Sequence, residues 1–215
     1  MEQVQMRIAH ACRRSGRSPD EITMIAVTKS VGTDAIRAAV ATGVQNLAEN
    51  RVQEAEAKRP DLRDFSGDVT WHMVGHLQSN KVKTAILLFD IIHSVDSLPL
   101  AEAISRRASS RRPIFLEVNV STESGKFGFS LDDLPDQYRA IRSLQNIEVL
   151  GLMTVAPQTK NAESVRPIFR HLRQAAHSLG LNGLSMGMSD DFEVAVEEGA
   201  THLRIGRAIF GERPE

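Results

Sequence analysis

Lys29 is the residue whose place in the sequence most directly suggests chemistry. It follows the apolar, β-branched run at 22–27, which is typical of a buried strand, and it precedes Ser30-Val31-Gly32. An amine in partly apolar surroundings can lose its proton and attack a carbonyl carbon to form a Schiff base. An ordinary surface lysine at a strand end fits the same pattern. The residues at the other strand ends bear on which interpretation holds.

Two later segments have the composition of an anion site. They are residues 184–190, Leu-Ser-Met-Gly-Met-Ser-Asp, and residues 202–207, His-Leu-Arg-Ile-Gly-Arg. Glycines let the backbone approach a ligand closely, and a following helix start offers N–H groups to a phosphate. We expect a hydroxyl contact from Ser185 and main-chain N–H contacts from Gly206 and Arg207. Turn formation and helix capping, with Ser189 and Asp190 as caps, is the alternative.

Arg204 stands between two apolar residues in a run that is typical of a buried parallel strand. A guanidinium keeps its charge in proteins, so a buried one needs hydrogen-bond partners. If the side chain faces the ligand-binding end, it can donate to a ring nitrogen and disfavour protonation there. The alternative is an internal salt bridge with one of three nearby acids, Asp190, Asp191 or Glu193.

The stretch 71–83 carries two histidines and two lysines around a predicted strand end and helix start. His72 and His76 are four residues apart but span the strand end, so the spacing of a helical zinc pair does not apply. We assign no metal. Lys81 and Lys83 in a first helical turn would oppose the helix dipole, which an anionic ligand or an acidic neighbour would explain. A solvated helix face explains them more simply.

A polar run around the fifth predicted strand consists of Glu117, Asn119, Glu123 and Lys126. A mobile lid and a catalytic group are both consistent with charged residues on a loop that follows a strand. Lys126 is the alternative to Lys29 as the carbonyl-binding lysine.

Predicted strands and helices alternate along the chain. Apolar runs predict eight strands, ending near residues 29, 50, 75, 95, 120, 155, 188 and 206. Helical patterns lie at residues 34–40 (after Thr33 as a possible cap), 52–57, 82–88, 100–108, 134–144, 165–179 and 192–198. An N-terminal amphipathic stretch places Cys12 on its buried face. Strands that alternate with helices in this way form parallel sheets with right-handed crossovers.

The polar residues just described all fall at predicted strand ends, where an α/β barrel gathers them on one rim. An open doubly wound sheet would place a ligand at one switch point and leave most of these ends unrelated. We therefore expect an α/β fold with a single closed (β/α)8 barrel of the TIM type, formed by residues 1–215 as one domain.

Composition narrows the class of ligand. The chain has 215 residues, 41% of them hydrophobic, and a formal net charge of -1. This near-neutral charge gives no basic field, so nucleic acid is not expected as a partner. The apolar stretch 85–92 is interrupted by Asp90 and is too short to span a bilayer, and no signal sequence is evident. We expect a cytoplasmic protein that binds a small molecule.

Several of these segments together resemble the pyridoxal 5′-phosphate (PLP) homeostasis protein family. The segments are residues 26–29, 49–54, 71–81, 123–128, 151–154, 184–189 and 204–211. The resemblance implies a barrel like the N-terminal domain of alanine racemase, with PLP held as a Schiff base on Lys29. It also places Asn50 beside the pyridine ring and Arg204 opposite the ring nitrogen. The resemblance surrounds the phosphate with Ser185, Gly206 and Arg207.

The expected site favours binding over substantial turnover. A protonated ring nitrogen makes PLP a strong electron sink, whereas an arginine opposite that nitrogen withholds the proton. Racemases with the same arginine use a tyrosine from a second domain, and the single tyrosine here, Tyr138, lies in a predicted helix before the rim. We expect a monomer that stores, delivers or buffers PLP, with apo-enzymes as recipients. A weak amino-acid racemase and a Schiff-base aldolase for a phosphorylated sugar are the alternatives.

Overall fold

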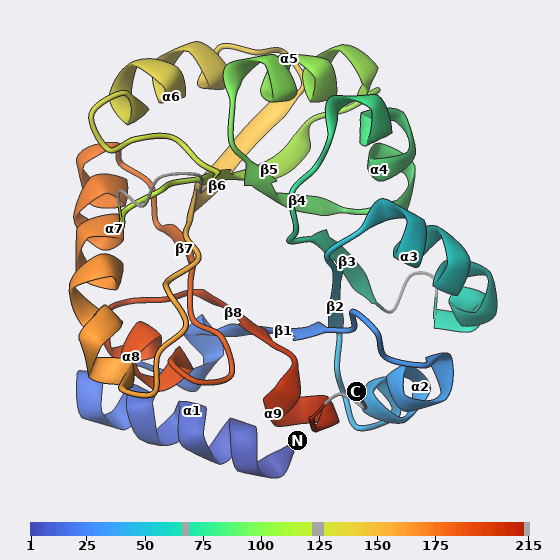
Figure 1. Ribbon diagram of the computed structural model, residues 1–215, viewed down its shortest axis with the longest axis vertical. Helices are drawn as coiled ribbons and strands as arrows, with labels where there is room; N and C mark the ends of the chain where they lie inside the picture. Colours follow the sequence, from blue (N-terminus) through green and yellow to red (C-terminus); the bar gives the residue numbers. More distant parts are fainter. Residues whose placement is uncertain (66–68, 122–126, 213–215) are drawn as a thin grey trace.

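The computed structural model describes residues 1–65, 69–121 and 127–212. Its centre is a closed barrel of parallel strands that pair in chain order (Figure 1). The strands are β1 (Thr23–Val27), β2 (Asn46–Glu49), β3 (Thr70–Met73), β4 (Ile91–Val95), β5 (Arg112–Glu117), β6 (Ile147–Met153), β7 (Gly183–Ser185) and β8 (His202–Ile205). Pairing of β8 with β1 closes the ring. The prediction of a (β/α)8 barrel is confirmed, and the open-sheet alternative is wrong.

Helices surround the barrel as an outer layer. They are α1 (Glu2–Ser15), α2 (Thr33–Ala41), α3 (Val52–Lys58), α4 (Val82–Leu88), α5 (Leu98–Arg107), α6 (Leu134–Arg142), α7 (Arg166–Ser178), α8 (Phe192–Glu197) and α9 (Arg207–Phe210). Short 3-10 turns lie at Pro19–Glu21, Arg59–Phe65, Ser79–Lys81 and Ala162–Val165. Figure 1 shows α1 lying beside α8 on the outside of the barrel. None of the helices in the described ranges has the length and apolar character needed to cross a membrane.

Two groups of buried side chains fill the molecule. The larger group packs between the barrel and the helices and includes Phe89, Phe169 and Phe192, each at most 1% exposed. Cys12 is buried in this layer, as its helical spacing predicts, and burial raises the pKa of its thiol. A small apolar cluster inside the barrel consists of Ile25, Val27 and Ala48 with Val74. Polar side chains occupy the interior around this cluster.

The predicted strand ends lie within three residues of the observed ones, with the largest differences at β5 and β7. The predicted helix caps are wrong at two places. α2 begins at Thr33 itself, with Gly32 as its N-cap residue in an extended conformation. α8 has Asp191 as its N-cap residue instead of Ser189 or Asp190. Asp191 makes no side-chain hydrogen bond to the helix N–H groups, and its carboxylate instead accepts from the preceding Met188 N–H, at 2.6 Å.

Candidate functional site at the carboxyl ends of the strands

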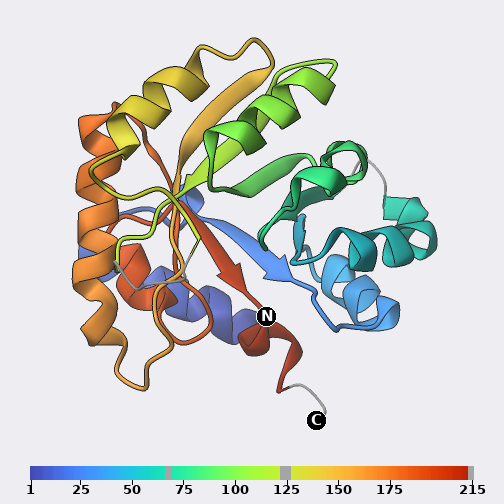
Figure 2. The same ribbon diagram turned by 45° about the horizontal axis from the view of Figure 1, so that its top comes forward.

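The residues predicted to bind a ligand follow the carboxyl ends of three strands. Lys29 lies two residues after β1, Asn50 one residue after β2, and Gly206 and Arg207 directly after β8. Because all strands are parallel, these positions share one rim of the barrel, toward which the β1 and β8 arrows run side by side in Figure 2. Ser185 is the last residue of β7, and Arg204 lies inside β8. The structure therefore gathers all six predicted residues at or just below this rim.

Lys29 sits in a tight turn whose backbone is held from both sides. The Val31 N–H donates to the Thr28 carbonyl at 2.9 Å, so that Lys29 and Ser30 are the central residues of the turn. Ser30 has a φ of 61°, in the left-handed region that residues other than glycine adopt only rarely. The Ser30 N–H donates to the Glu54 carboxylate of α3. The Lys58 ammonium, also from α3, donates to the Thr28 carbonyl at 2.7 Å.

A charged clamp formed by Glu49, Glu54 and Lys58 lies behind this turn, between the barrel and α3. Lys58 Nζ is 2.8 Å from Oε1 of both carboxylates. Glu49 is fully buried, and burial raises the pKa of its carboxyl group although Lys58 and Thr28 both donate to it. Burial also acts on Glu54, but the bonds from Lys58 and Ser30 outweigh it and lower the pKa of that carboxyl group. Lys58 therefore compensates a carboxylate that water does not reach.

The loop after β3 packs closely against the backbone of Asn50. A Cβ atom on Gly75 would lie 2.3 Å from the Asn50 carbonyl oxygen, so only glycine fits there without a backbone shift. The Gly75 carbonyl in turn accepts a 2.6 Å hydrogen bond from the Ser94 hydroxyl. By strand alternation, Asn46 and Ala48 share the barrel-interior face of β2, and Asn50 is the first residue after that strand.

Arg204 is 5% exposed and uses its guanidinium inside the barrel. One terminal nitrogen donates to the Ser185 hydroxyl at 2.7 Å and the other donates to the Thr154 carbonyl at 2.8 Å. Burial lowers the pKa of Arg204 to about 10, and the nearby carboxylates of Asp191 and Glu117 act in the opposite direction. Arg204 therefore remains protonated at neutral pH.

The predicted salt-bridge alternative for Arg204 does not describe its contacts. Asp190 pairs with Arg207 instead. Glu193 pairs with Arg7 and Arg14 of α1. Asp191 acts on Arg204 only through its charge, because its carboxylate accepts the Met188 N–H.

Ser185 lies in the barrel interior, where it is fully buried. Its hydroxyl oxygen is 2.8 Å from His93 Nδ1 and accepts the bond from Arg204. His93 Nε2 is 2.9 Å from His72 Nδ1, and His72 Nε2 is 3.0 Å from Asn46 Oδ1. We call this row of five residues the neutral chain. Its first four members, Asn46, His72, His93 and Ser185, are uncharged at neutral pH, and Arg204 at its end carries the charge.

The loops after β7 and β8 are tied to each other beside the N-terminus of α9. The Arg207 guanidinium binds the Asp190 carboxylate across the two loops. The Ala208 N–H donates to the Ser189 hydroxyl at 3.2 Å. The Arg204 N–H donates to the carbonyl of Gly187, whose φ of 92° lets the chain turn there. Ser189, which the sequence suggested only as a helix cap, thus lies beside Gly206 and Arg207.

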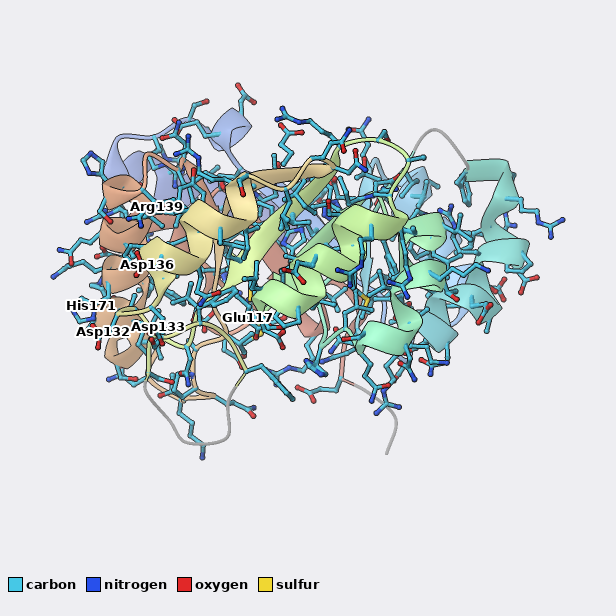
Figure 3. All side chains as sticks on the ribbon, turned by 90° about the horizontal axis from the view of Figure 1, so that it is seen from above. Glu117, Asp132, Asp133, Asp136, Arg139 and His171 are labelled. Atoms are coloured by element: carbon cyan, nitrogen blue, oxygen red, sulfur yellow. The ribbon has the colours of Figure 1, made fainter. Side chains whose placement is uncertain are left out.

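The polar run after β5 is partly described. Glu123 and Lys126 lie outside the described residues. Burial, together with the nearby charge of Asp96, raises the pKa of Glu117 to about 7. Figure 3 shows Glu117 toward the middle of the molecule, apart from the polar residues Asp132, Asp133, Asp136, Arg139 and His171 on the side of α6 and α7. Glu117 is therefore a rim carboxyl that titrates near neutral pH.

The remaining predicted polar residues have local explanations. His76 binds the Asp96 carboxylate at 3.0 Å and stacks on Phe127 with ring centroids 3.8 Å apart. Lys81 is the N-cap residue of α4, and Lys83 is exposed on that helix, as a solvated helix face requires. Within the described ranges, no group of three or more His, Cys, Asp or Glu side chains could hold a metal ion.

The rim carries three kinds of group that can bind a ligand. They are a lysine amine that can attack a carbonyl carbon, a fixed and buried guanidinium that donates hydrogen bonds, and main-chain N–H groups at a helix start. These match an aldehyde, an aromatic ring nitrogen and a phosphate, respectively. The sequence did not identify the partners that hold these groups. Lys58 and His93 lie in ordinary helix and strand patterns, and neither type nor spacing marks them.

Comparison with known proteins identifies relatives over the whole length of the chain. The model of the alanine racemase N-terminal domain matches residues 3–214. The pyridoxal phosphate homeostasis protein of Aquifex aeolicus is 41% identical, with 99% of this chain and 96% of that protein covered. The protein of that name from Pseudomonas aeruginosa is 39% identical, with 98% and 93% covered.

Solved structures show the same fold. PipY of Synechococcus elongatus without PLP superposes with a TM-score of 0.86 and 40% identity, with 96% of this chain and 99% of PipY covered. PipY with PLP bound gives a TM-score of 0.83, 38% identity, and coverage of 95% and 100%. An alanine racemase of Clostridium difficile shares the fold, with a TM-score of 0.72, 13% identity, and coverage of 99% of this chain and 57% of the racemase. By these full-length matches, the chain belongs to the pyridoxal phosphate homeostasis protein family.

Proposed function

We propose that this protein binds PLP at the carboxyl rim of its barrel and stores, delivers or buffers the cofactor. The observation that carries the proposal is the buried guanidinium of Arg204, fixed by neutral acceptors on the same rim as Lys29. Full-length similarity to PipY, of which one structure contains PLP, supports the choice of ligand. When bound, PLP supplies an aldehyde that condenses with amines and a ring that withdraws electrons.

Five of the six predicted residues have a direct role in this proposal, and Ser185 contacts Arg204. Lys29 holds the aldehyde carbon as a Schiff base, and Asn50 lies beside the ring. Arg204 donates to the ring nitrogen. Gly206 and Arg207 present main-chain N–H groups to the phosphate, joined by the Ser189 hydroxyl, which lies at the start of α9.

Binding without substantial turnover follows from the same arginine. Arg204 keeps its proton at neutral pH, so it donates a hydrogen bond to the ring nitrogen without protonating it. An unprotonated ring is a weaker electron sink for amino-acid chemistry. Tyr138 belongs to α6, in the helix layer, where it packs against the outer core. It does not stand at the rim as a second base.

A weak racemase is the second candidate, and Glu117 is the observation that favours it. A rim carboxyl whose pKa is about 7 can both take up and release a proton near neutral pH. Exchange of the α-proton of L-amino acids in deuterated water separates the candidates. Exchange on the order of 1 per second or faster would establish an enzyme.

Titration of the purified protein with PLP and with pyridoxal tests the proposed function. PLP should develop Schiff-base absorbance and bind far more tightly than pyridoxal, because charge-assisted bonds to phosphate add roughly 1.5 to 3 kcal/mol each. Lys29→Ala should abolish the absorbance, whereas Lys83→Ala, which changes an exposed lysine of α4, should retain it. Equal binding of PLP and pyridoxal would remove the loops after β7 and β8 from the site.

Three further properties belong to the proposal: that residues 1–215 act as one barrel domain, that the protein is a monomer, and that it works in the cytoplasm with apo-enzymes as recipients. A single cooperative unfolding transition tests the first, and the molar mass from light scattering of the loaded protein tests the second. Transfer is measured by mixing the loaded protein with a PLP-dependent apo-enzyme and following recovery of that enzyme's activity. A recovery rate no faster than with an equal concentration of free PLP would contradict delivery.

A further inference from the structure

The neutral chain runs from the lower part of the barrel interior to the ligand-binding rim. It connects Asn46 of β2, His72 of β3, His93 of β4, Ser185 of β7 and Arg204 of β8 through contacts of 2.7 to 3.0 Å. Four of these residues are at most 5% exposed. The chain thus crosses the barrel from β2 to β8 and ends on the guanidinium.

With neutral rings and the Asn46 amide as the structure places it, only one arrangement of protons satisfies every contact in this chain. Asn46 Oδ1 is an acceptor, so His72 Nε2 must carry a hydrogen and His72 Nδ1 must accept. His93 Nε2 must then donate, and His93 Nδ1 must accept from the Ser185 hydroxyl. The Ser185 oxygen remains free to accept from Arg204, which can only donate.

The electrostatics of the interior agree with neutral rings. Burial, with a smaller contribution from His202, lowers the pKa of His72 to about 3. Burial has the largest effect on the pKa of His93 and holds it well below its ordinary value. Electrostatic interactions with His72, His202 and Arg204 act in the same direction. Burial and Arg204 also lower the pKa of His202 to about 4. The interior therefore carries the charge of Arg204 without a second cation.

This ordering assigns the single proton of Ser185 to His93 and its oxygen to Arg204, which leaves no donor for a phosphate. We propose that Ser185, His93 and His72 are positioning residues that hold Arg204 toward the ring nitrogen of the ligand, and that Ser185 is not a phosphate contact. This inference rests on the proposed binding of PLP. Its first two tests are made without ligand, so they stand or fall separately from that proposal.

The first test reads the proton positions by nitrogen-15 NMR of the histidine rings in the ligand-free protein. His72 and His93, assigned with His72→Gln and His93→Gln variants, should both be neutral with the hydrogen on Nε2 between pH 8 and pH 5.5. A hydrogen on Nδ1 of either ring, or a charged ring at pH 7, would overturn the ordering.

The second test reads the mobility of Arg204 through its side-chain nitrogen-15 signals. Ser185→Ala should speed hydrogen exchange and increase motion of the guanidinium. Ser105→Ala, which removes another buried serine hydroxyl in α5, should leave both unchanged. An Arg204 signal that is the same in the wild type and in Ser185→Ala would contradict the positioning role.

The third test separates the ring nitrogen from the phosphate by ligand chemistry. Ser185→Ala should weaken PLP binding about tenfold and change binding of a 1-deaza analogue, which has carbon in place of the ring nitrogen, less than about twofold. Ser189→Ala should weaken both ligands equally. Equal losses for Ser185→Ala with both ligands would make Ser185 a phosphate contact. If the wild type binds neither ligand, the proposed function fails, while the two NMR tests still decide the ordering.

Discussion

Two of the residues proposed to hold PLP, Lys29 and Arg204, are supported by networks of opposite character. The backbone around Lys29 is held by the charged clamp of Glu49, Glu54 and Lys58, outside the barrel against α3. Arg204 is held by uncharged groups inside the barrel. Lys58 keeps 13% of its side chain exposed, so the clamp reaches the edge of solvent. The barrel interior does not reach solvent. A second charge there would be desolvated and would need its own counter-ion.

The comparison shows how one rim can combine two rigid supports. Ion pairs suit the helix layer, where a lysine stem can cover apolar surface and bring its ammonium to a carboxylate. Histidine and serine suit the enclosed interior, since a neutral ring both donates and accepts. We therefore expect the clamp to depend on pH and the neutral chain not to.

Breaking the clamp should give the largest effect on stability. Lys58→Met leaves Glu49 buried without its cation, and we expect a loss of about 3 to 5 kcal/mol in the free energy of unfolding at pH 8. The loss should shrink as pH falls through the raised pKa of Glu49, because a protonated carboxyl group needs no counter-ion. Urea unfolding at pH 8 and pH 5.5 measures both.

Lys83→Met is the matched control for this prediction, since it removes an exposed lysine on α4 and should change stability by less than about 0.5 kcal/mol. A Lys58→Met variant as stable as this control would show that the clamp does not compensate Glu49.

Breaking the neutral chain should cost less and should not depend on pH. Ser185→Ala removes the acceptor of Arg204 and the donor to His93, for an expected loss of about 1 to 3 kcal/mol. The loss should be the same at pH 8 and pH 5.5, because burial lowers the pKa of His72 to about 3 and holds the pKa of His93 well below its ordinary value. A loss that grows as the solution is acidified from pH 7 would mean that a ring in the chain becomes charged.

Replacing Glu117 should change stability least. It should stabilise the protein at high pH, where Lys58→Met destabilises it. Its pKa is raised to about 7 in the folded protein, so folding favours the protonated form and stability falls as pH rises from about 4.5 to 7. Glu117→Gln should therefore stabilise the protein relative to the wild type by about 1 to 2 kcal/mol at pH 8 and by little at pH 5. Thermal unfolding at the two pH values measures the difference. Equal effects at both would place the titration elsewhere.

The fold could be predicted because the signals that define it are local. Apolar runs such as Ile147–Met153 and the helical periods between them specify alternating strands and helices, and eight such units close a barrel. The rim location of Lys29, Asn50, Gly206 and Arg207 followed from the same alternation, since carboxyl ends of parallel strands meet.

The supports of the site could not be predicted, since they depend on where side chains point after the strands end. β7 is only three residues long and the chain turns at Gly187, so Ser185 remains inside the barrel while Ser189 reaches α9. Two serines four residues apart gave no sign of this difference. Lys58 reaches the Thr28 carbonyl across 30 positions of sequence, and no spacing rule reports such a contact.

Reduction of the PLP-loaded protein with borohydride, followed by peptide mass spectrometry, identifies the lysine that forms the Schiff base. Borohydride fixes the Schiff base as a stable pyridoxyl group on the lysine that formed it. We expect one pyridoxyl group per chain, on the peptide that contains Lys29, and none in Lys29→Ala. A pyridoxyl group on Lys126 or on any other lysine of the wild type, with Lys29 unmodified, would contradict it.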